Sequence, residues 1–392
     1  MKHKYFKMKL TVGIIGTGAM GAGIAQIAAS NGCRVLMYDT SNEMLTKAVN
    51  NIGSSLQKLL EKNKLKEEEK NTILNHISVH SQMHDLASCN LIIEAIIEDL
   101  TIKKGVFSSL EEIVRPDCIL ASNTSSLSIA SIAAACKQKE RVIGIHFFNP
   151  AVLMPLVEII PSLTTSEEVF NQSYAIIKSW GKVTVKAKDT PGFIVNRLAR
   201  PFYGEAIKIY EEGMADFATI DYAMKSLGEF KMGPFELMDF IGNDVNYRVT
   251  ETVWQQFFYD PRYRPSLTQK RLFEAGLFGR KTNKGYYDYS AAEMPQPNTS
   301  PELLQKIFLR IMAMLINEAA EALFLQIGTR EDLDLAMEKG VNYKKGLLKW
   351  ADEIGLDIIL NELNSLHQWF GDDRYRASVL LKQKVKEGSR FY

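Results

Sequence analysis

The sequence has few cysteines, almost no net charge and no long apolar segment. Its four cysteines (Cys33, Cys89, Cys118 and Cys136) form no CxxC pair. Their scarcity argues against a disulfide framework or a zinc site and favours free thiols in a reducing, cytoplasmic compartment. The formal net charge of +1 gives no reason to expect a nucleic-acid partner. No segment approaches the ~20 consecutive apolar residues of a membrane span, so no membrane association is expected.

The N-terminus combines a basic start with an uncharged stretch. "MKHKYFKMKL" precedes "TVGIIGTGAMGAGIAQIAAS", and such a pair could be a secretory signal. Five glycines interrupt the uncharged stretch, however, and three of them follow a nucleotide-binding spacing described below. We therefore expect no export.

The first half alternates short apolar runs with amphipathic stretches. This pattern predicts a Rossmann-like α/β domain with a parallel sheet covered by helices on both faces. The predicted strands cover residues 10–15, 33–39, 91–96, 117–123 and 141–147. Residues 41–75 interrupt the alternation and predict a pair of helices with a charged turn between them.

Beyond residue 188 the pattern is helical and repeats itself. "DYAMKSLGEFKMGPFELMDFIGND" (221–244) aligns without gaps to "DLAMEKGVNYKKGLLKWADEIGLD" (334–357). Glycines and aspartates in the same order predict a duplicated all-α module. We expect four segments: an α/β domain at 9–188, a helical domain at 189–290, a linker at 291–302 and a second helical copy at 303–392.

"GTGAMG" follows the first predicted strand and opens a helix, and Asp39 ends the next strand. This is the dinucleotide fingerprint: the first glycine allows the turn, the second lets the pyrophosphate approach, and the third allows close packing. Asp39 suits ribose hydroxyls and would repel a 2′-phosphate, which favours NAD. The expected cofactor contacts are Gly16, Thr17, Gly18, Ala19, Met20, Gly21 and Asp39.

Seven motifs in order resemble the L-3-hydroxyacyl-CoA dehydrogenase family. They are "GTGAMG", "IIEAIIEDLTIKK", "SNTSSLSI", "GIHFFNP", "DTPGFIVNR", "GPFELMDFIGND" and "GRKTNKGYYDY". The resemblance covers residues 10 to about 290, and the later repeat resembles a second copy of the family's C-terminal domain. It implies NAD-dependent, reversible oxidation of an L-3-hydroxyacyl-CoA, with short chains such as 3-hydroxybutyryl-CoA as the expected acyl groups.

The resemblance also implies a catalytic set. His146 in "GIHFFNP" would be the general base, a role that suits an imidazole. Glu158 alternates with its apolar neighbours in "LVEII", and a lone carboxylate there needs a partner, for which a histidine is suitable. Ser125 and Asn196 would contact the reacting oxygen or the acyl carbonyl. The alternatives are a core histidine at His146 and a helix cap at Ser125.

Further contacts follow only from the resemblance. Glu98, Lys103, Asn149 and Lys281 match positions near the nicotinamide side of the cofactor, although each could instead be a surface residue. The helical arm 41–75 would grip CoA through Ser55 and Lys62, and Ser125 also falls among the cofactor and CoA positions. Three histidines at 76, 80 and 84 could suggest a metal, but their β-like surroundings lead us to expect none.

Two other functions fit the same motifs. Relatives of the family oxidise small non-CoA hydroxy acids, and an NAD-binding structural protein is also possible because a fold does not fix a function. Family members end near "GYYDY" and dimerise through the C-terminal domain. We expect the second copy here to pack on the first and replace the dimer partner, which leaves a homodimer as the other possibility.

Overall fold

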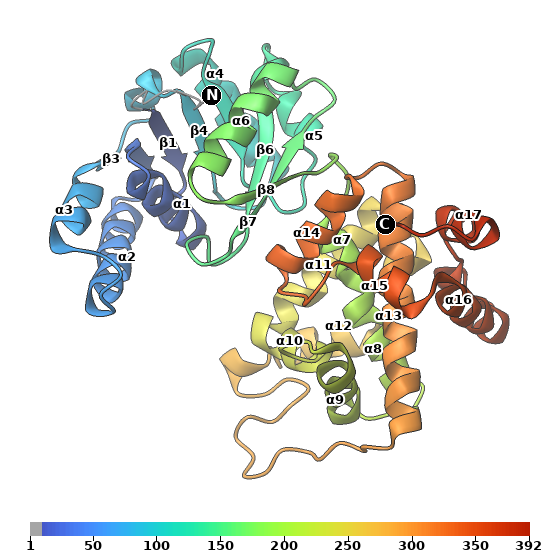
Figure 1. The fold of residues 1–392 in the computed structure, drawn as a ribbon. Coiled ribbons are helices and arrows are strands. Elements are labelled where there is room, and N and C mark those ends of the chain that lie inside the picture. The colour runs from blue at the N-terminus through green and yellow to red at the C-terminus, as the bar shows by residue number, and fades with distance from the viewer. Residues whose placement is uncertain (1–9) are drawn as a thin grey trace. The chain divides into compact units, whose positions relative to one another are not determined.

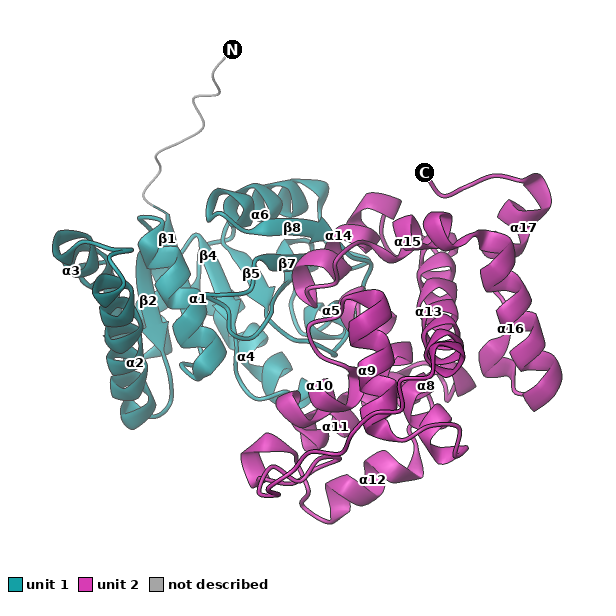
Figure 2. Cartoon of the chain, turned by 60° about the horizontal axis from the view of Figure 1, so that its bottom comes forward, with its two compact units in different colours: residues 1–189 teal, residues 190–392 magenta. Residues whose placement is uncertain are grey.

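The structure, a computed structural model, describes residues 10–392. The basic segment considered above as part of a signal, and residue 9 of the expected first domain, lie outside the described residues. The chain forms two compact units, Met1–Asp189 and Thr190–Tyr392, coloured separately in Figure 2. No helix within residues 10–392 combines the length and the apolar character needed to cross a membrane.

The first unit is built on one eight-stranded sheet in the order β3-β2-β1-β4-β5-β6-β7-β8 (Figure 1). The strands are β1 (Thr11–Ile15), β2 (Arg34–Tyr38), β3 (Ile77–His80), β4 (Leu91–Glu94), β5 (Ile119–Ser122), β6 (Val142–Phe147), β7 (Leu156–Pro161) and β8 (Val183–Lys186). The apolar strands are buried on both faces because helices cover the sheet. The predicted α/β fold is confirmed.

One strand pair departs from the expected all-parallel sheet. β6 and β7 are antiparallel, whereas every other neighbouring pair is parallel. Only residues 148–155 connect them, and this length allows the chain to turn back but not to make a parallel crossover. β7 therefore begins at the edge of the sheet where β6 ends.

Helices α1 (Ala19–Ser30), α5 (Ile129–Ala133) and α6 (Glu167–Ser179) pack against strands of this sheet, and α4 (Leu100–Ile113) lies beside α5. β1 lies between β2 and β4, so the chain leaves β1 toward one side and later returns on the other. In open α/β sheets, this reversal opens a crevice at the carboxyl ends of the strands, where ligands bind.

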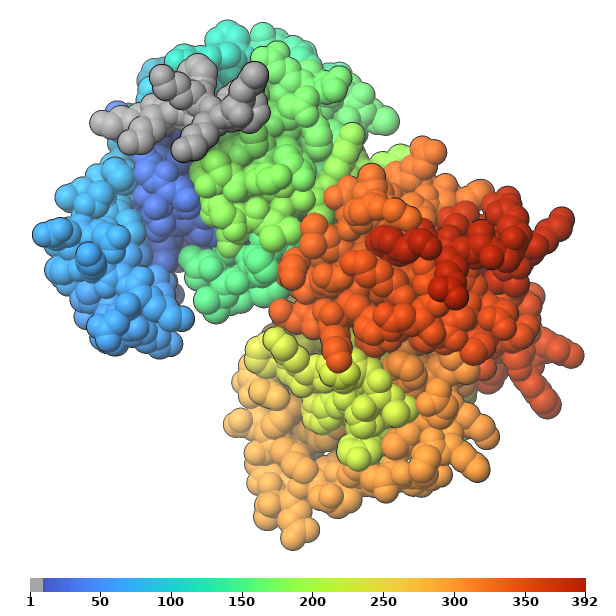
Figure 3. All heavy atoms as spheres, viewed as in Figure 1, coloured from blue at the N-terminus to red at the C-terminus, as the bar shows by residue number. Residues whose placement is uncertain are grey.

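The predicted helical pair at residues 41–75 is present as α2 (Asn42–Glu61) and α3 (Glu67–Asn75). Ser41 caps α2 by accepting the N–H of Met44. The apolar stripe of α2 that includes Leu45, Ile52 and Leu56 is buried, and its opposite face is exposed. The pair forms the light-blue lobe in Figure 3.

The second unit is helical. Its first part contains α7 (Val195–Leu198), α8 (Arg200–Glu211), α9 (Phe217–Gly228), α10 (Pro234–Ile241), α11 (Asn243–Gln256) and α12 (Leu267–Glu274). Its second part contains α13 (Pro301–Phe324), α14 (Arg330–Gly340), α15 (Leu347–Ile354), α16 (Leu356–Phe370) and α17 (Val379–Glu387). α13, which is buried along most of its length, packs against helices of both parts.

The duplication is visible in equivalent hydrogen bonds. The Asp221 carboxylate accepts two backbone N–H groups at the start of α10 and the hydroxyl of Tyr287. The Asp334 carboxylate accepts two N–H groups at the start of α15 and the hydroxyl of Tyr392. In each copy, one aspartate therefore bonds both to the start of the next helix and to a tyrosine near the end of the copy. We call this arrangement the aspartate clamp.

Reciprocal ion pairs connect the two copies. Arg197 donates to Glu318 at 2.6 Å, and Arg310 donates to Glu205 at 2.6 Å. Arg197 and Arg310 hold equivalent positions in the repeat, as do Glu205 and Glu318. Each glutamate also accepts a tyrosine hydroxyl, Tyr263 for Glu318 and Tyr375 for Glu205. The contacts are self-complementary, which is the pattern of a two-fold interface.

We predict that Glu318→Gln strongly destabilises the second unit. The substitution leaves the buried Arg197 guanidinium without its counter-charge, a change that costs about 3–5 kcal/mol. Urea unfolding measures the difference. The control is Glu331→Gln, which removes an exposed carboxylate paired with Arg330 and should unfold like the wild type. Equal midpoints for all three proteins would contradict the prediction.

Candidate active site

The glycine loop is tied to the end of β2 through one carboxylate. Asp39 accepts the backbone N–H of Thr17 at 2.8 Å and its hydroxyl at 3.0 Å, and its other oxygen accepts the N–H of Ser41. Gly16 has φ +85° and donates its N–H to the carbonyl of Tyr38. Asp39 and the loop therefore form one rigid edge of the crevice at β1 and β2.

The glycines of this loop meet different constraints. A Cβ on Gly21 would lie 1.8 Å from the carbonyl oxygen of Gly16, so the helix could not pack on the turn. A Cβ on Gly18 would meet no protein atom within 4 Å. Gly18 also begins α1 without a side-chain cap. An uncapped helix N-terminus with open space in front of it fits a pyrophosphate, so the residues present suit NAD.

His146 and Glu158 face each other across β6 and β7. The two residues are directly paired in the antiparallel register, and His146 Nδ1 lies 2.7 Å from Glu158 Oε2. Both side chains are buried. The expected hydrogen bond is thus present, and the histidine sits one residue before the carboxyl end of β6.

A buried ion cluster lies next to this edge. Lys103 on α4 is 1% exposed, and its ammonium lies 2.5 Å from Glu94 and 3.3 Å from Glu98. Glu94 also accepts the hydroxyl of Ser122. The alternative of a surface charge at Lys103 is wrong, because the side chain is enclosed between two carboxylates.

Glu98 organises the loop that carries Ser125. Its carboxylate accepts the backbone N–H of Ser125 at 3.0 Å and the hydroxyls of Thr124 and Ser126 at 2.6 and 3.0 Å. Burial opposes ionisation of Glu98, but Lys103 and these donors outweigh it, and its pKa lies below the ordinary value. The ionised carboxylate therefore fixes the loop after β5.

Sequence reasoning did not find Glu94 as part of the site. The signal was available: Glu94 stands in the apolar strand "LIIE", as Glu158 stands in "LVEII", and a lone strand carboxylate needs a partner. Asn123 was also missed; its side-chain oxygen accepts the N–H of Phe147 and joins the ends of β5 and β6. No sequence pattern marked that contact.

The remaining expected residues lie on several elements. Asn149 is exposed just after β6, Ser55 lies on α2, and Lys62 caps the C-terminal end of α2. In the second unit, Asn196 lies on α7, and Lys281 makes an ion pair with Asp244. The first three and the last two belong to different compact units.

No metal site is visible in the described part of the chain. Within residues 10–392 no three His, Cys, Asp or Glu side chains are arranged to hold an ion. His76 contacts the Ala29 carbonyl, and His80 contacts Ser78 and Asp85. The histidine spacing in the sequence therefore corresponds to separate hydrogen bonds.

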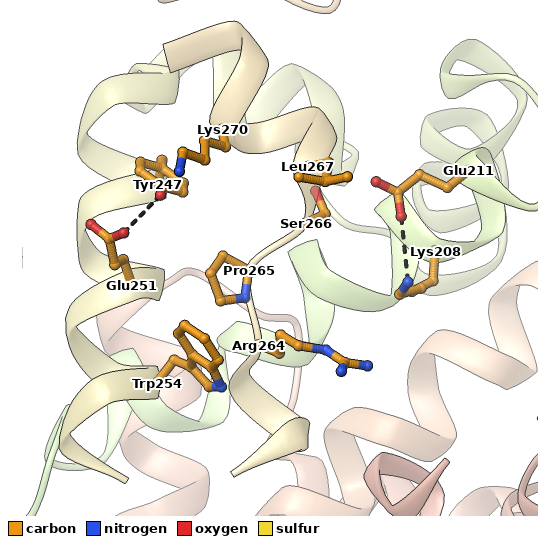
Figure 4. Close-up of a pocket in the computed structure, with 10 residues that line it drawn as sticks. All are labelled: Lys208, Glu211, Tyr247, Glu251, Trp254, Arg264, Pro265, Ser266, Leu267 and Lys270. Atoms are coloured by element: carbon orange, nitrogen blue, oxygen red, sulfur yellow. Dashed lines mark hydrogen bonds and ion pairs between the residues drawn. The ribbon is translucent and has the colours of Figure 1, made fainter. Parts of the chain in front are cut away.

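A cavity of about 510 Å³ in the second unit lies between α8, α11 and the start of α12. Figure 4 shows two pairs among its lining residues: Tyr247 donates to Glu251, and Lys208 pairs with Glu211. None of the residues expected from the sequence lines this cavity, and we assign it no role.

The glycine loop, the oriented histidine and the enclosing sheet edge define a nicotinamide-dependent dehydrogenase of the Rossmann class. Residues 11–190 match the NAD-binding domain of 3-hydroxyacyl-CoA dehydrogenase. Residues 192–289 and 307–390 both match its C-terminal domain. The chain belongs to the 3-hydroxyacyl-CoA dehydrogenase family and is an NAD-dependent oxidoreductase.

Similar proteins fall into longer and shorter forms. A 3-hydroxyadipyl-CoA dehydrogenase of Escherichia coli is 36% identical over 96% of this chain and 97% of its own. A crystal structure of 3-hydroxybutyryl-CoA dehydrogenase from Escherichia coli has a TM-score of 0.92 at 36% identity, covering 97% of this chain and 99% of that one. A 3-hydroxybutyryl-CoA dehydrogenase of Bradyrhizobium diazoefficiens is 40% identical over 72% of this chain and 96% of its own.

We predict that Gly18→Ala weakens NADH binding without unfolding the protein. The added methyl group meets no protein atom but occupies space that the pyrophosphate needs, so the dissociation constant should rise at least about tenfold, or about 1.4 kcal/mol. NADH fluorescence titration and thermal unfolding measure the two effects. Gly105→Ala, exposed on α4 with equally open space, should leave NADH affinity unchanged. Unaltered affinity in Gly18→Ala would contradict the assignment of the loop.

Proposed function

We propose that the protein oxidises the C3 hydroxyl of an L-3-hydroxyacyl-CoA, with His146 as the general base. The main support for this proposal is the 2.7 Å contact between His146 Nδ1 and Glu158 Oε2 at the carboxyl end of β6. A carboxylate that accepts from Nδ1–H fixes the tautomer in which Nε2 holds the lone pair. Nε2 then takes the hydroxyl proton as the carbonyl forms.

The cofactor NAD, when bound, accepts the hydride from C3. In this proposal the glycine loop from Gly16 to Gly21 holds the pyrophosphate, and Asp39 accepts the adenosine ribose hydroxyls. Glu98, Lys103, Asn149 and Lys281 complete the nicotinamide side. Support for Glu98 and Lys103 comes from their shared ion pair beside the Ser125 loop; Asn149 and Lys281 rest on the family resemblance alone.

Ser125 and Asn196 act on the substrate oxygen. Both offer neutral donors, which stabilise the oxyanion that develops when the ketone is reduced in the reverse direction. The Ser125 backbone is held by Glu98, so its position does not depend on substrate. In this proposal Ser125 also contacts both the cofactor and the CoA substrate.

The CoA tail is proposed to lie on the α2–α3 arm. Lys62 is exposed at the end of α2, where an ammonium can meet phosphate groups, and Ser55 lies two turns earlier on the same helix. The acyl groups named for the similar proteins are 3-hydroxyadipyl and 3-hydroxybutyryl, so we propose a short acyl chain.

We further propose that the second helical copy replaces the partner subunit of shorter relatives. The reciprocal pairs Arg197–Glu318 and Arg310–Glu205 support this, because an interface between two identical subunits has the same self-complementary form. The position equivalent to Asn196 in the second copy is an apolar residue, Leu309. In this proposal the second copy therefore has a structural role and takes no part in catalysis.

A reducing, cytoplasmic location is consistent with the cysteines. All four are free and buried, and burial raises the pKa of the Cys89 and Cys118 thiols to about 12. Such thiols are inert, as expected of structural cysteines.

We predict that His146→Gln lowers kcat by about 10²–10⁴-fold because the proton acceptor is lost. Absorbance of NADH formed from an L-3-hydroxyacyl-CoA measures the rate. Glu158→Gln should lower kcat less and leave NADH affinity intact, since it affects only the tautomer and orientation of the ring. His84→Gln, an exposed histidine outside the site, is the control. A His146→Gln rate equal to wild type would end this proposal.

We predict that the protein is a monomer at assay concentration, because its internal two-fold contact already occupies the helical surface. Size-exclusion chromatography with light scattering should give the mass of one chain. A dimer whose contacts, mapped by hydrogen exchange, fall on residues 188–290 would refute the replacement of the partner subunit.

A further inference from the structure

Arg200, at the start of α8, is a buried cation without an acid. Its side chain is 8% exposed. Nε donates to the carbonyl of Asn196 at 3.0 Å, and Nη1 donates to the hydroxyl of Thr250 at 3.2 Å. The guanidinium also lies 4.9 Å from the ring centroid of Tyr203. No carboxylate within residues 10–392 lies at ion-pair distance from it, and burial lowers its pKa.

Other buried arginines of this unit are neutralised. Arg197 pairs with Glu318, and Arg310 and Arg374 both pair with Glu205. A buried charge without a partner destabilises a folded protein. The absence of an acid beside Arg200 therefore calls for an explanation that the other arginines do not need.

The second helical copy shows that the fold does not require this cation. The position equivalent to Arg200 is Ala313, and the positions equivalent to Thr250 and Asn246 are Leu363 and Ile359. All three replacements are fully buried. The same helix packing is thus achieved with an apolar interior, so the polar side chains of the first copy serve something other than packing.

Asn246, which is linked to Arg200 through Thr250, carries a donor that lacks a partner. Asn246 is 2% exposed, and its Nδ2 is buried with no hydrogen-bond partner. Its backbone carbonyl accepts the Thr250 hydroxyl, the same hydroxyl that receives Arg200. Arg200 lacks a counter-charge and Asn246 Nδ2 lacks an acceptor, and an anionic acceptor would supply both.

We propose that Arg200 binds a carboxylate at the far end of the acyl chain, so that the preferred substrate is a dicarboxylyl-CoA. This rests on the proposed function, in which Asn196 contacts the substrate. Arg200 follows Asn196 by one helical turn, or about 6 Å along the helix axis, a distance that a short acyl chain spans. The carboxylate replaces the missing counter-ion, and the thioester and C3 hydroxyl remain with the catalytic residues.

Two substrates of equal carbon number test the proposal. (S)-3-hydroxyadipyl-CoA ends in a carboxylate and (S)-3-hydroxyhexanoyl-CoA ends in a methyl group. Wild type should have a kcat/KM about ten- to a hundredfold higher for the adipyl substrate, as expected of one charge-assisted hydrogen-bonded pair. Arg200→Ala should remove that preference, mainly through KM, and Arg200→Lys should keep part of it.

Arg200→Ala introduces the residue that the second copy already carries, and NADH affinity together with thermal unfolding reports whether it folds. Arg271→Ala, an exposed arginine on α12, should not change the preference. Equal wild-type rates on both substrates, or an equal loss on both in Arg200→Ala and Arg200→Lys, would overturn the role of Arg200 and leave the dehydrogenase intact. No turnover of either substrate by wild type would overturn the proposed function and this inference with it.

Discussion

The hydrogen bond between His146 and Glu158 depends on the reversal of one strand. In a sheet that is otherwise parallel, β7 runs antiparallel to β6 and starts at the edge where β6 ends. A parallel β7 would start at the opposite edge, and its early residues would lie far from the crevice. The reversal places a carboxylate directly opposite the histidine, on the same face, near the carboxyl ends of the strands.

Most other buried charged side chains, like Glu158, have a partner. Glu94 and Lys103 enclose one another beneath the Ser125 loop, and Arg197 and Glu318 join the two helical copies. Such pairs add little net stability compared with apolar residues, but they fix which surfaces meet. Arg200 stands apart because no carboxylate within residues 10–392 lies at ion-pair distance from it, and for this reason we propose a substrate carboxylate as its partner.

The sequence was sufficient for the features that rest on local pattern. Apolar runs predicted β1, β2, β4, β5 and β6 but not the short β3, the glycine spacing predicted the nucleotide loop, and alternation in "LVEII" predicted the partner of His146. It was insufficient where tertiary contacts decide. The antiparallel β7 follows from a short connection, and the contact from Asn123 to Phe147 follows from the order of strands. The sequence could not exclude an exposed Lys103. A lysine in a charged segment has the same sequence context whether or not a buried glutamate pairs with it.

The duplicated module separates what the fold needs from what the chemistry needs. Both copies keep the aspartate clamps at Asp221 and Asp334 and the reciprocal arginine–glutamate pairs, so these contacts belong to folding and assembly. Only the first copy keeps polar residues in the interior at Arg200, Asn246 and Thr250. Because the second copy retains the same helices with alanine and aliphatic residues there, selection for stability alone would not maintain a buried cation in the first. At these three positions the second copy shows the same helix packing with apolar side chains. The difference between the two copies therefore indicates which of these residues serve function and not folding.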